Sequence, residues 1–195
     1  MPLTLFACRG GRVTLPDRAA LLLDRQDGGN LCVLPPRDAW ERGELSPGEL
    51  AAFSFLVAAT GHAMLEALPQ LHGGCVNYWE AGNWALNDDA EPRGPKTARA
   101  HRHMHLHLLG RSPSGQRWGE SPAFPDFKGR LTWAAEFQRL TPLECHGIVA
   151  QAQSRLETFY GVPADHWSPW SACRHCEYPT PLEAQVDERC AECQA

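Results

Sequence analysis

The chain has 195 residues, 43% of them apolar, which is enough for one domain with a real core and a small additional unit. Its formal net charge is −5 and it has no long basic run, so it is not expected to bind nucleic acid by neutralising many phosphates. No apolar run reaches the ~20 residues that span a bilayer, and the first residues do not resemble a signal peptide. We therefore expect a cytoplasmic protein whose eight cysteines are thiols or metal ligands rather than disulfides.

Short strand-like runs occupy the first third of the chain. Residues 3–7 and 11–15 flank a Gly-Gly step as the strands of a hairpin would. Residues 20–23 and 31–34 are two more such runs, joined by Asp-Gly and Gly-Asn steps that favour a turn. A further strand is predicted over 76–81.

Two segments carry the signals of a helix N-terminus. Ser46-Pro47-Gly48-Glu49 combines a capping serine, a proline at the first helical position and a glutamate three residues after the cap. Apolar residues then recur at helical spacing to about Leu68. Thr141-Pro142-Leu143-Glu144 repeats this pattern and predicts a second helix to about Tyr160. Residues 127–140 are also predicted to be helical.

Residues 101–109 carry a histidine at every second position. Side chains on a strand alternate between its two faces, so a strand here would present all four imidazoles on one face. The opposite face, mostly apolar, would pack on a core. The four histidines are His101, His103, His105 and His107.

An unperturbed imidazole titrates near pH ~6.5, so it can act as a nucleophile, an acid or a hydrogen-bond donor at neutral pH. A tetrahedral phosphate can contact two or three imidazoles on one strand face. One would attack phosphorus while its neighbours bind oxygens or protonate the leaving group. The alternative is a set of structural or metal-binding histidines.

The end of the chain carries two Cys-x-x-Cys pairs, Cys173/Cys176 and Cys190/Cys193, with 13 residues between them. Zinc prefers four thiolates or imidazoles in a tetrahedron, and each pair can supply one edge of it. A segment so poor in apolar residues needs a metal in order to fold, so we expect structural zinc here. Exposed dithiols or disulfides are the alternative, and His175 is an alternative ligand.

The segment His103-Met-His105-Leu-His107-Leu-Leu109 resembles the signature of the histidine-triad (HIT) family of nucleotide hydrolases and transferases, in which histidines alternate with apolar residues. The order of strands, turn and capped helix before it is also similar, over roughly residues 15–115. The resemblance implies an α+β fold with an antiparallel sheet of about five strands and two main helices. We accordingly expect a catalytic domain over 1–165, a zinc-ribbon-like tail over 166–195, and a homodimer.

The resemblance also implies roles for the three histidines. His105 would attack the α-phosphorus of a nucleoside phosphate to form a nucleotidyl-histidine, which water or another acceptor then releases. His107 would contact the phosphate or the leaving group, and His103 would orient the nucleophile. A histidine at the last motif position favours hydrolysis over uridylyl transfer. The bond cleaved would be that of a nucleoside phosphoramidate, a dinucleoside polyphosphate or a related substrate.

Four further positions are implied as nucleotide contacts. Asp24 follows an early strand-like run, where the family holds the ribose. Asn83, with Asn87 as second candidate, would contact phosphate or the nucleophile, and Arg99 could meet a phosphate or be solvated.

The chain departs from the family where other members have an additional histidine. Asn30 and Asp38 stand at those positions. These departures motivate a second hypothesis, a non-catalytic nucleotide- or metal-binding module whose zinc tail contacts a partner. A third is a metalloenzyme that uses the histidine strand as ligands.

Overall fold

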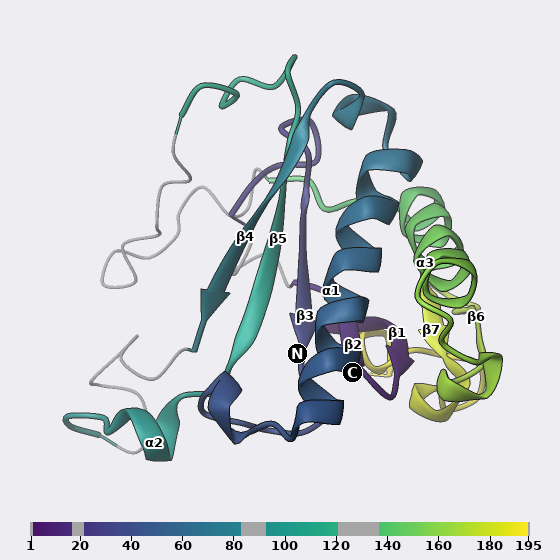
Figure 1. Ribbon diagram of the computed structural model, residues 1–195. Helices are drawn as coiled ribbons and strands as arrows, with labels where there is room; N and C mark the ends of the chain where they lie inside the picture. The colour runs from purple at the N-terminus through teal and green to yellow at the C-terminus, as the bar shows by residue number, and fades with distance from the viewer. Residues whose placement is uncertain (1, 17–21, 83–92, 121–136, 195) are drawn as a thin grey trace.

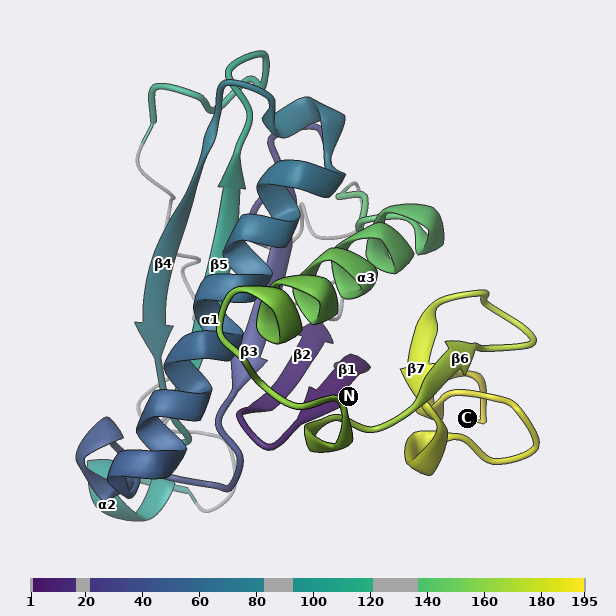
Figure 2. The same ribbon diagram turned by 45° about the vertical axis from the view of Figure 1, so that its right-hand side comes forward.

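The computed structural model describes residues 2–16, 22–82, 93–120 and 137–194. It has a mixed α+β fold in which a five-stranded antiparallel sheet carries two main helices on one face (Figures 1 and 2). The predicted α+β class and the sheet of about five strands are therefore confirmed.

The sheet has the strand order β1-β2-β3-β5-β4, and every neighbouring pair is antiparallel. β5 therefore lies inside the sheet, between β3 and β4, although about 70 residues separate it from β3 in the chain. The strands are β1 (Leu3–Cys8), β2 (Gly11–Leu15), β3 (Asn30–Leu34), β4 (Cys75–Ala81) and β5 (His105–Arg111).

The two main helices begin where the capping signals predict. α1 (Pro47–Ala67) and α3 (Pro142–Thr158) each have a complete capping box, formed by Ser46 with Glu49 and by Thr141 with Glu144. The helices pack against each other and on the sheet (Figure 2). Their buried side chains form one core with the sheet, whose largest members include Phe6, Phe53, Leu31, Leu56 and Met64.

By length and composition alone, α1 would pass as a membrane-spanning helix. In this structure it instead packs on the sheet and on α3, and Phe53, Leu56 and Met64 are buried there. The core helix of a globular domain can be equally long and apolar, so the length and composition of α1 do not indicate a membrane span.

The shorter elements complete the chain. They are η2 (Arg42–Glu44), η3 (Pro69–Leu71), α2 (Ala98–His101), η5 (Ala164–His166), β6 (Trp170–Ala172), β7 (Pro179–Pro181), η6 (Leu182–Ala184) and η7 (Ala191–Cys193). β6 and β7 pair as a separate two-stranded sheet in the cysteine-rich tail.

Three predicted elements differ from the structure. The histidine strand begins at His105 rather than His101, because residues 98–101 form the helical turn α2. Leu22 and Leu23 are not in a strand, and the rest of that predicted run lies outside the described residues. Of the predicted helix 127–140, only residues 137–140 are described. They are irregular, and α3 begins only at Pro142, after the Thr141 cap.

The tail is anchored to the main domain through α3 and the segment before it. The Tyr178 hydroxyl donates to the Leu140 carbonyl at 2.8 Å, and His146 Nε2 lies 2.8 Å from the Glu177 carbonyl. Arg139 forms a bidentate ion pair with Glu192. The tail therefore packs on its own chain, a question the sequence left open.

Glu144 ties the start of α3 to the turn before β3. Its carboxylate accepts hydrogen bonds from Arg25, Gln70 and Thr141. Burial acts to raise the pKa of this carboxyl, but these hydrogen bonds outweigh it and hold the pKa below its usual value.

A carboxylate with a lowered folded-state pKa contributes stability that is present above its unfolded value of 4.5 and is lost as the pH falls through the folded value. We therefore expect Glu144→Gln to lower the free energy of unfolding at pH 7 by about 1–3 kcal/mol. This deficit should shrink below about pH 4.5. Urea unfolding of the wild type and of Glu144→Gln, at pH values above and below 4.5, measures this deficit.

Glu49→Gln is the matched control, because Glu49 occupies the same capping position on α1 but its side chain is 31% exposed, against 9% for Glu144. The free energy of unfolding lost in Glu49→Gln should be smaller than that lost in Glu144→Gln at every pH. An equal deficit for the two variants, or a Glu144→Gln deficit that does not change with pH, would contradict the role given to the buried carboxylate.

Candidate histidine site on strand β5

The side chains of β5 alternate between the two faces of the sheet. Leu106 and Leu108 belong to the core beneath the helices, as does Met104 just before the strand. His105 and His107 therefore project from the opposite face, and their rings lie 5.0 Å apart, edge to face. The period-two pattern predicted this arrangement from the sequence.

His103 and His101 differ in position from the predicted row. His103 precedes the strand and is exposed, with its backbone N–H donating to the Gly82 carbonyl and not to the β3 ladder. His101 is the last residue of α2, so it does not continue the face formed by His105 and His107.

His105 is held in one tautomer by the backbone. Its Nδ1 lies 2.8 Å from the His103 carbonyl oxygen, which can only accept, so Nδ1 carries the proton and Nε2 carries the lone pair. Burial lowers the pKa of His105, although the hydrogen bond to His103 opposes that effect. At neutral pH the ring is therefore neutral and its Nε2 is free to act as a nucleophile or a ligand.

His107 lies two residues further along β5, in the middle of the sheet. Its ring stacks on Trp79 of β4, with centroids 5.2 Å apart and planes 19° apart. Burial, assisted by His105, lowers the pKa of His107 to about 3. Among the described residues Nδ1 has no hydrogen-bond partner. A buried nitrogen without a partner is costly, so a ligand that engages this ring would compensate it.

Cys32 is a member of the site that sequence reasoning missed. It pairs directly with His107 across the β3–β5 ladder, so the two side chains share a face. Burial raises the pKa of Cys32 to about 12, although the Thr14 hydroxyl and the Leu106 N–H oppose this. The ligand atoms of Cys32, His105 and His107 lie within 4.8 Å of one another. Only the strand register could have revealed the cysteine.

The structure gives Asp38 a partner that the sequence did not predict. His103 Nδ1 lies 2.9 Å and 3.0 Å from the two carboxylate oxygens of Asp38. The aspartate at a position where the histidine-triad resemblance would place a histidine is therefore paired with the first histidine of the motif.

The predicted nucleotide contacts lie in several places. Asp24 organises the turn before β3, where its carboxylate accepts from the backbone N–H groups of Gln26 and Gln138. Arg99 is exposed on α2, with Nη2 3.9 Å from Glu44. Asn83 and Asn87 lie outside the described residues.

The four tail cysteines come together as predicted. Their sulfur atoms all lie within 4.8 Å of one another, and those of Cys176 and Cys190 are 3.5 Å apart. Tetrahedral coordination at about 2.3 Å requires sulfur separations of about 3.8 Å, so the cluster is compatible with one metal ion. His175 is exposed and is not part of the cluster.

The tail backbone supports a thiolate at Cys173, whereas burial raises the pKa of Cys176 and of Cys193. Burial acts to raise the pKa of Cys173, but N–H groups of Cys176, Cys190 and His175 lower it to about 6. Glu177, Asp187 and Glu188 adopt positive φ, which is rare for residues with side chains. A backbone held in this form requires strong local constraint.

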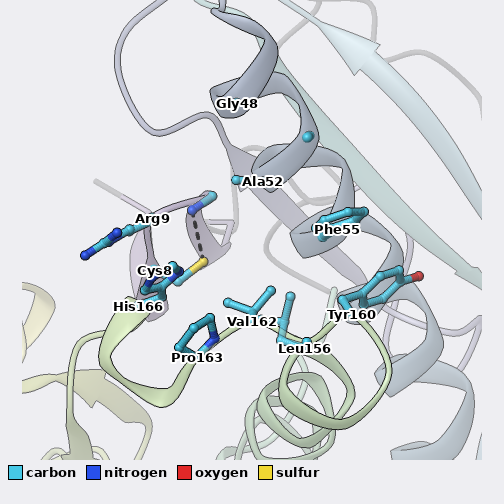
Figure 3. Close-up of a pocket in the computed structure, with 13 residues that line it drawn as sticks. Cys8, Arg9, Gly48, Ala52, Phe55, Leu156, Tyr160, Val162, Pro163 and His166 are labelled. Atoms are coloured by element: carbon cyan, nitrogen blue, oxygen red, sulfur yellow. Dashed lines mark hydrogen bonds between the residues drawn. The ribbon is translucent and has the colours of Figure 1, made fainter.

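A separate recess of about 250 Å³ lies between the start of α1, the β1–β2 turn and the end of α3. Figure 3 shows its apolar lining, including Phe55, Tyr160 and Val162, and the hydrogen bond from the Gly10 N–H to Cys8 Sγ. None of the predicted site residues lines it, so it is not the candidate site.

Comparison of the chain with models of known protein families gives no match, and comparison with curated proteins gives none either. The case for a function therefore rests on the geometry around β5 and on the cysteine cluster.

Proposed function

We propose that this chain is a histidine-triad nucleotide hydrolase that cleaves a nucleoside phosphoramidate, a dinucleoside polyphosphate or a related nucleotidyl bond. One observation carries the proposal: the His103 carbonyl lies 2.8 Å from His105 Nδ1 and holds its N–H, so that Nε2 presents a lone pair. Burial, which lowers the pKa of His105, favours the same neutral form. A nucleophilic imidazole needs this tautomer.

His105 Nε2 attacks the α-phosphorus, the nitrogen–phosphorus bond forms, and the bond from phosphorus to the leaving group breaks. His107 lies beside the nucleophile, 5.0 Å between ring centroids. A bound phosphate raises the low pKa of His107 by its negative charge, so this ring can hold a proton for the leaving group. Water then cleaves the nitrogen–phosphorus bond and releases the nucleotide.

His103 and Asp38 act on the nucleophile from outside the face that His105 and His107 share. The Asp38 carboxylate holds the His103 ring, and the His103 carbonyl holds His105. His103 is therefore a positioning residue whose backbone does the orienting. This arrangement gives Asp38 a role although a histidine is expected there by family resemblance.

The test is incubation of the full chain with a panel of adenosine and guanosine phosphoramidates and dinucleoside polyphosphates. We expect nucleoside monophosphate as product, and a mass increase of one nucleotidyl group on the protein after rapid acid quench. Binding without product or adduct would support a non-catalytic nucleotide-binding module instead and would refute the hydrolase.

We also propose that the tail cluster holds one structural Zn²⁺ through Cys173, Cys176, Cys190 and Cys193. Four thiolates satisfy the ion completely, so it has no open position for chemistry. The ion would constrain the positive-φ residues beside both cysteine pairs and so maintain the surface that contacts α3.

A further inference from the structure

We propose that Cys32, His105 and His107 form a second metal site, one that takes a thiophilic d¹⁰ cation, Zn²⁺ or Cu⁺, on the face of the sheet opposite the two main helices. The site does not depend on the hydrolase proposal, because it needs only the three side chains. A cation bound there would occupy the nitrogen that we assign as the nucleophile.

The ligand set suits such a cation. One thiolate and two imidazoles are soft to borderline donors, which favour Zn²⁺ or Cu⁺ over Mg²⁺ or Ca²⁺. The three ligand atoms lie within 4.8 Å of one another. Coordination bonds of about 2.0–2.3 Å require the ligand atoms to lie about 3.3–3.9 Å from one another. Small side-chain rotations that move each ligand atom by about 1 Å would bring them to that separation.

The strands hold the three ligands rigidly. Cys32 on β3 and His107 on β5 are directly paired, and His105 is two residues from His107 on the same strand face. Sites built on neighbouring strands keep their ligands in place better than sites on loops. Coordination therefore needs no backbone rearrangement.

The surroundings of the two histidines resemble those of metal ligands. A coordinating histidine usually donates its other ring N–H to a carbonyl or a carboxylate, and His105 does so through Nδ1 to the His103 carbonyl. His107 is 8% exposed, and among the described residues its Nδ1 has no hydrogen-bond partner. The His107 ring can therefore still accept a ligand, in a buried place that water does not easily reach.

Binding has a proton balance that can be measured. Coordination removes the thiol proton of Cys32, so one proton is released for each cation bound, and no electron is transferred. The buried cluster then carries +1 with Zn²⁺ and is neutral with Cu⁺. Three protein ligands leave Zn²⁺ an open position, whereas Cu⁺ is satisfied by three.

The test is zinc titration of the full chain with its tail zinc in place, with bound metal measured after equilibrium dialysis. We expect one additional zinc per chain, released protons in equal number, and shifted ¹⁵N signals of the His105 and His107 rings. Cys32→Ala, which removes the sulfur without adding bulk, and Cys32→Ser should each bind the additional ion at least about a hundredfold more weakly. A parallel anaerobic titration with Cu⁺ against a competing chelator distinguishes the two cations.

Cys75→Ser is the matched control, because Cys75 is exposed on β4 and outside the cluster. It should bind the additional zinc as the wild type does. The proposal is overturned if the wild type binds no additional Zn²⁺ or Cu⁺, or if folded Cys32 variants bind it unchanged. These outcomes are measured without nucleotide, so they are distinguishable from a failure of the hydrolase proposal.

Discussion

Replacement of His105 by asparagine is expected to abolish the nucleotidyl adduct and to lower turnover by on the order of 10³-fold or more. Asparagine is smaller, but its side-chain amide can still donate to the His103 carbonyl, so the fold around β5 is preserved. The substitution removes the far side of the ring, which carries the nucleophilic Nε2. Rapid-quench mass spectrometry and single-turnover kinetics with the best substrate of the panel measure both effects.

His101→Asn is the matched control for this prediction. His101 ends α2 outside the β5 face, so its replacement should leave both adduct and turnover within about twofold of the wild type. An adduct that persists in His105→Asn would assign the nucleophile to another group. Equal losses in the two variants would show that the row of histidines does not act as described.

Replacement of Cys173 by serine is expected to remove one zinc per chain and to unfold the tail. Structural zinc contributes on the order of 10 kcal/mol to folding of a small Cys-rich unit, far more than the few apolar contacts of this tail. Amide exchange should locate the loss at the backbone bonds around the first Cys pair. These include Glu177 N–H to the Cys173 carbonyl and Cys173 N–H to the Tyr178 carbonyl.

The β3–β5 ladder should keep its protection from exchange in this variant, because it belongs to the main sheet. The zinc content of Cys75→Ser should equal that of the wild type. A Cys173→Ser protein that retains its zinc or its tail protection would show that the four sulfurs are held together without a metal.

Local patterns determined much of this molecule from the sequence. The two capping boxes located α1 and α3 to within a residue at their starts, because an N-cap uses only residues within one turn. The alternation after Met104 assigned His105 and His107 to one face for the same reason, since side-chain direction on a strand is a local property. The spacing of the two cysteine pairs likewise predicted that their sulfurs gather.

The residue at which the histidine strand begins is set by contacts with residues far away in the chain. Arg102 is anchored to the Trp40 carbonyl and to Glu80, and the Met104 N–H donates to the Ala39 carbonyl. These partners lie far away in the chain and draw residues 102–104 out of the ladder. Alternation alone extends the strand to His101 because it carries no information about such contacts.

What the sequence by itself determined is which residues share a face, where the helices begin and which cysteines form pairs. Tertiary structure alone decided which side chain from another strand lies opposite each of these. The β3–β5 register places Cys32 against His107, and the packing of the loop before α1 places Asp38 on His103. A shift of one residue in that register would turn Cys32 to the other face, and only pairing across the sheet sets the register.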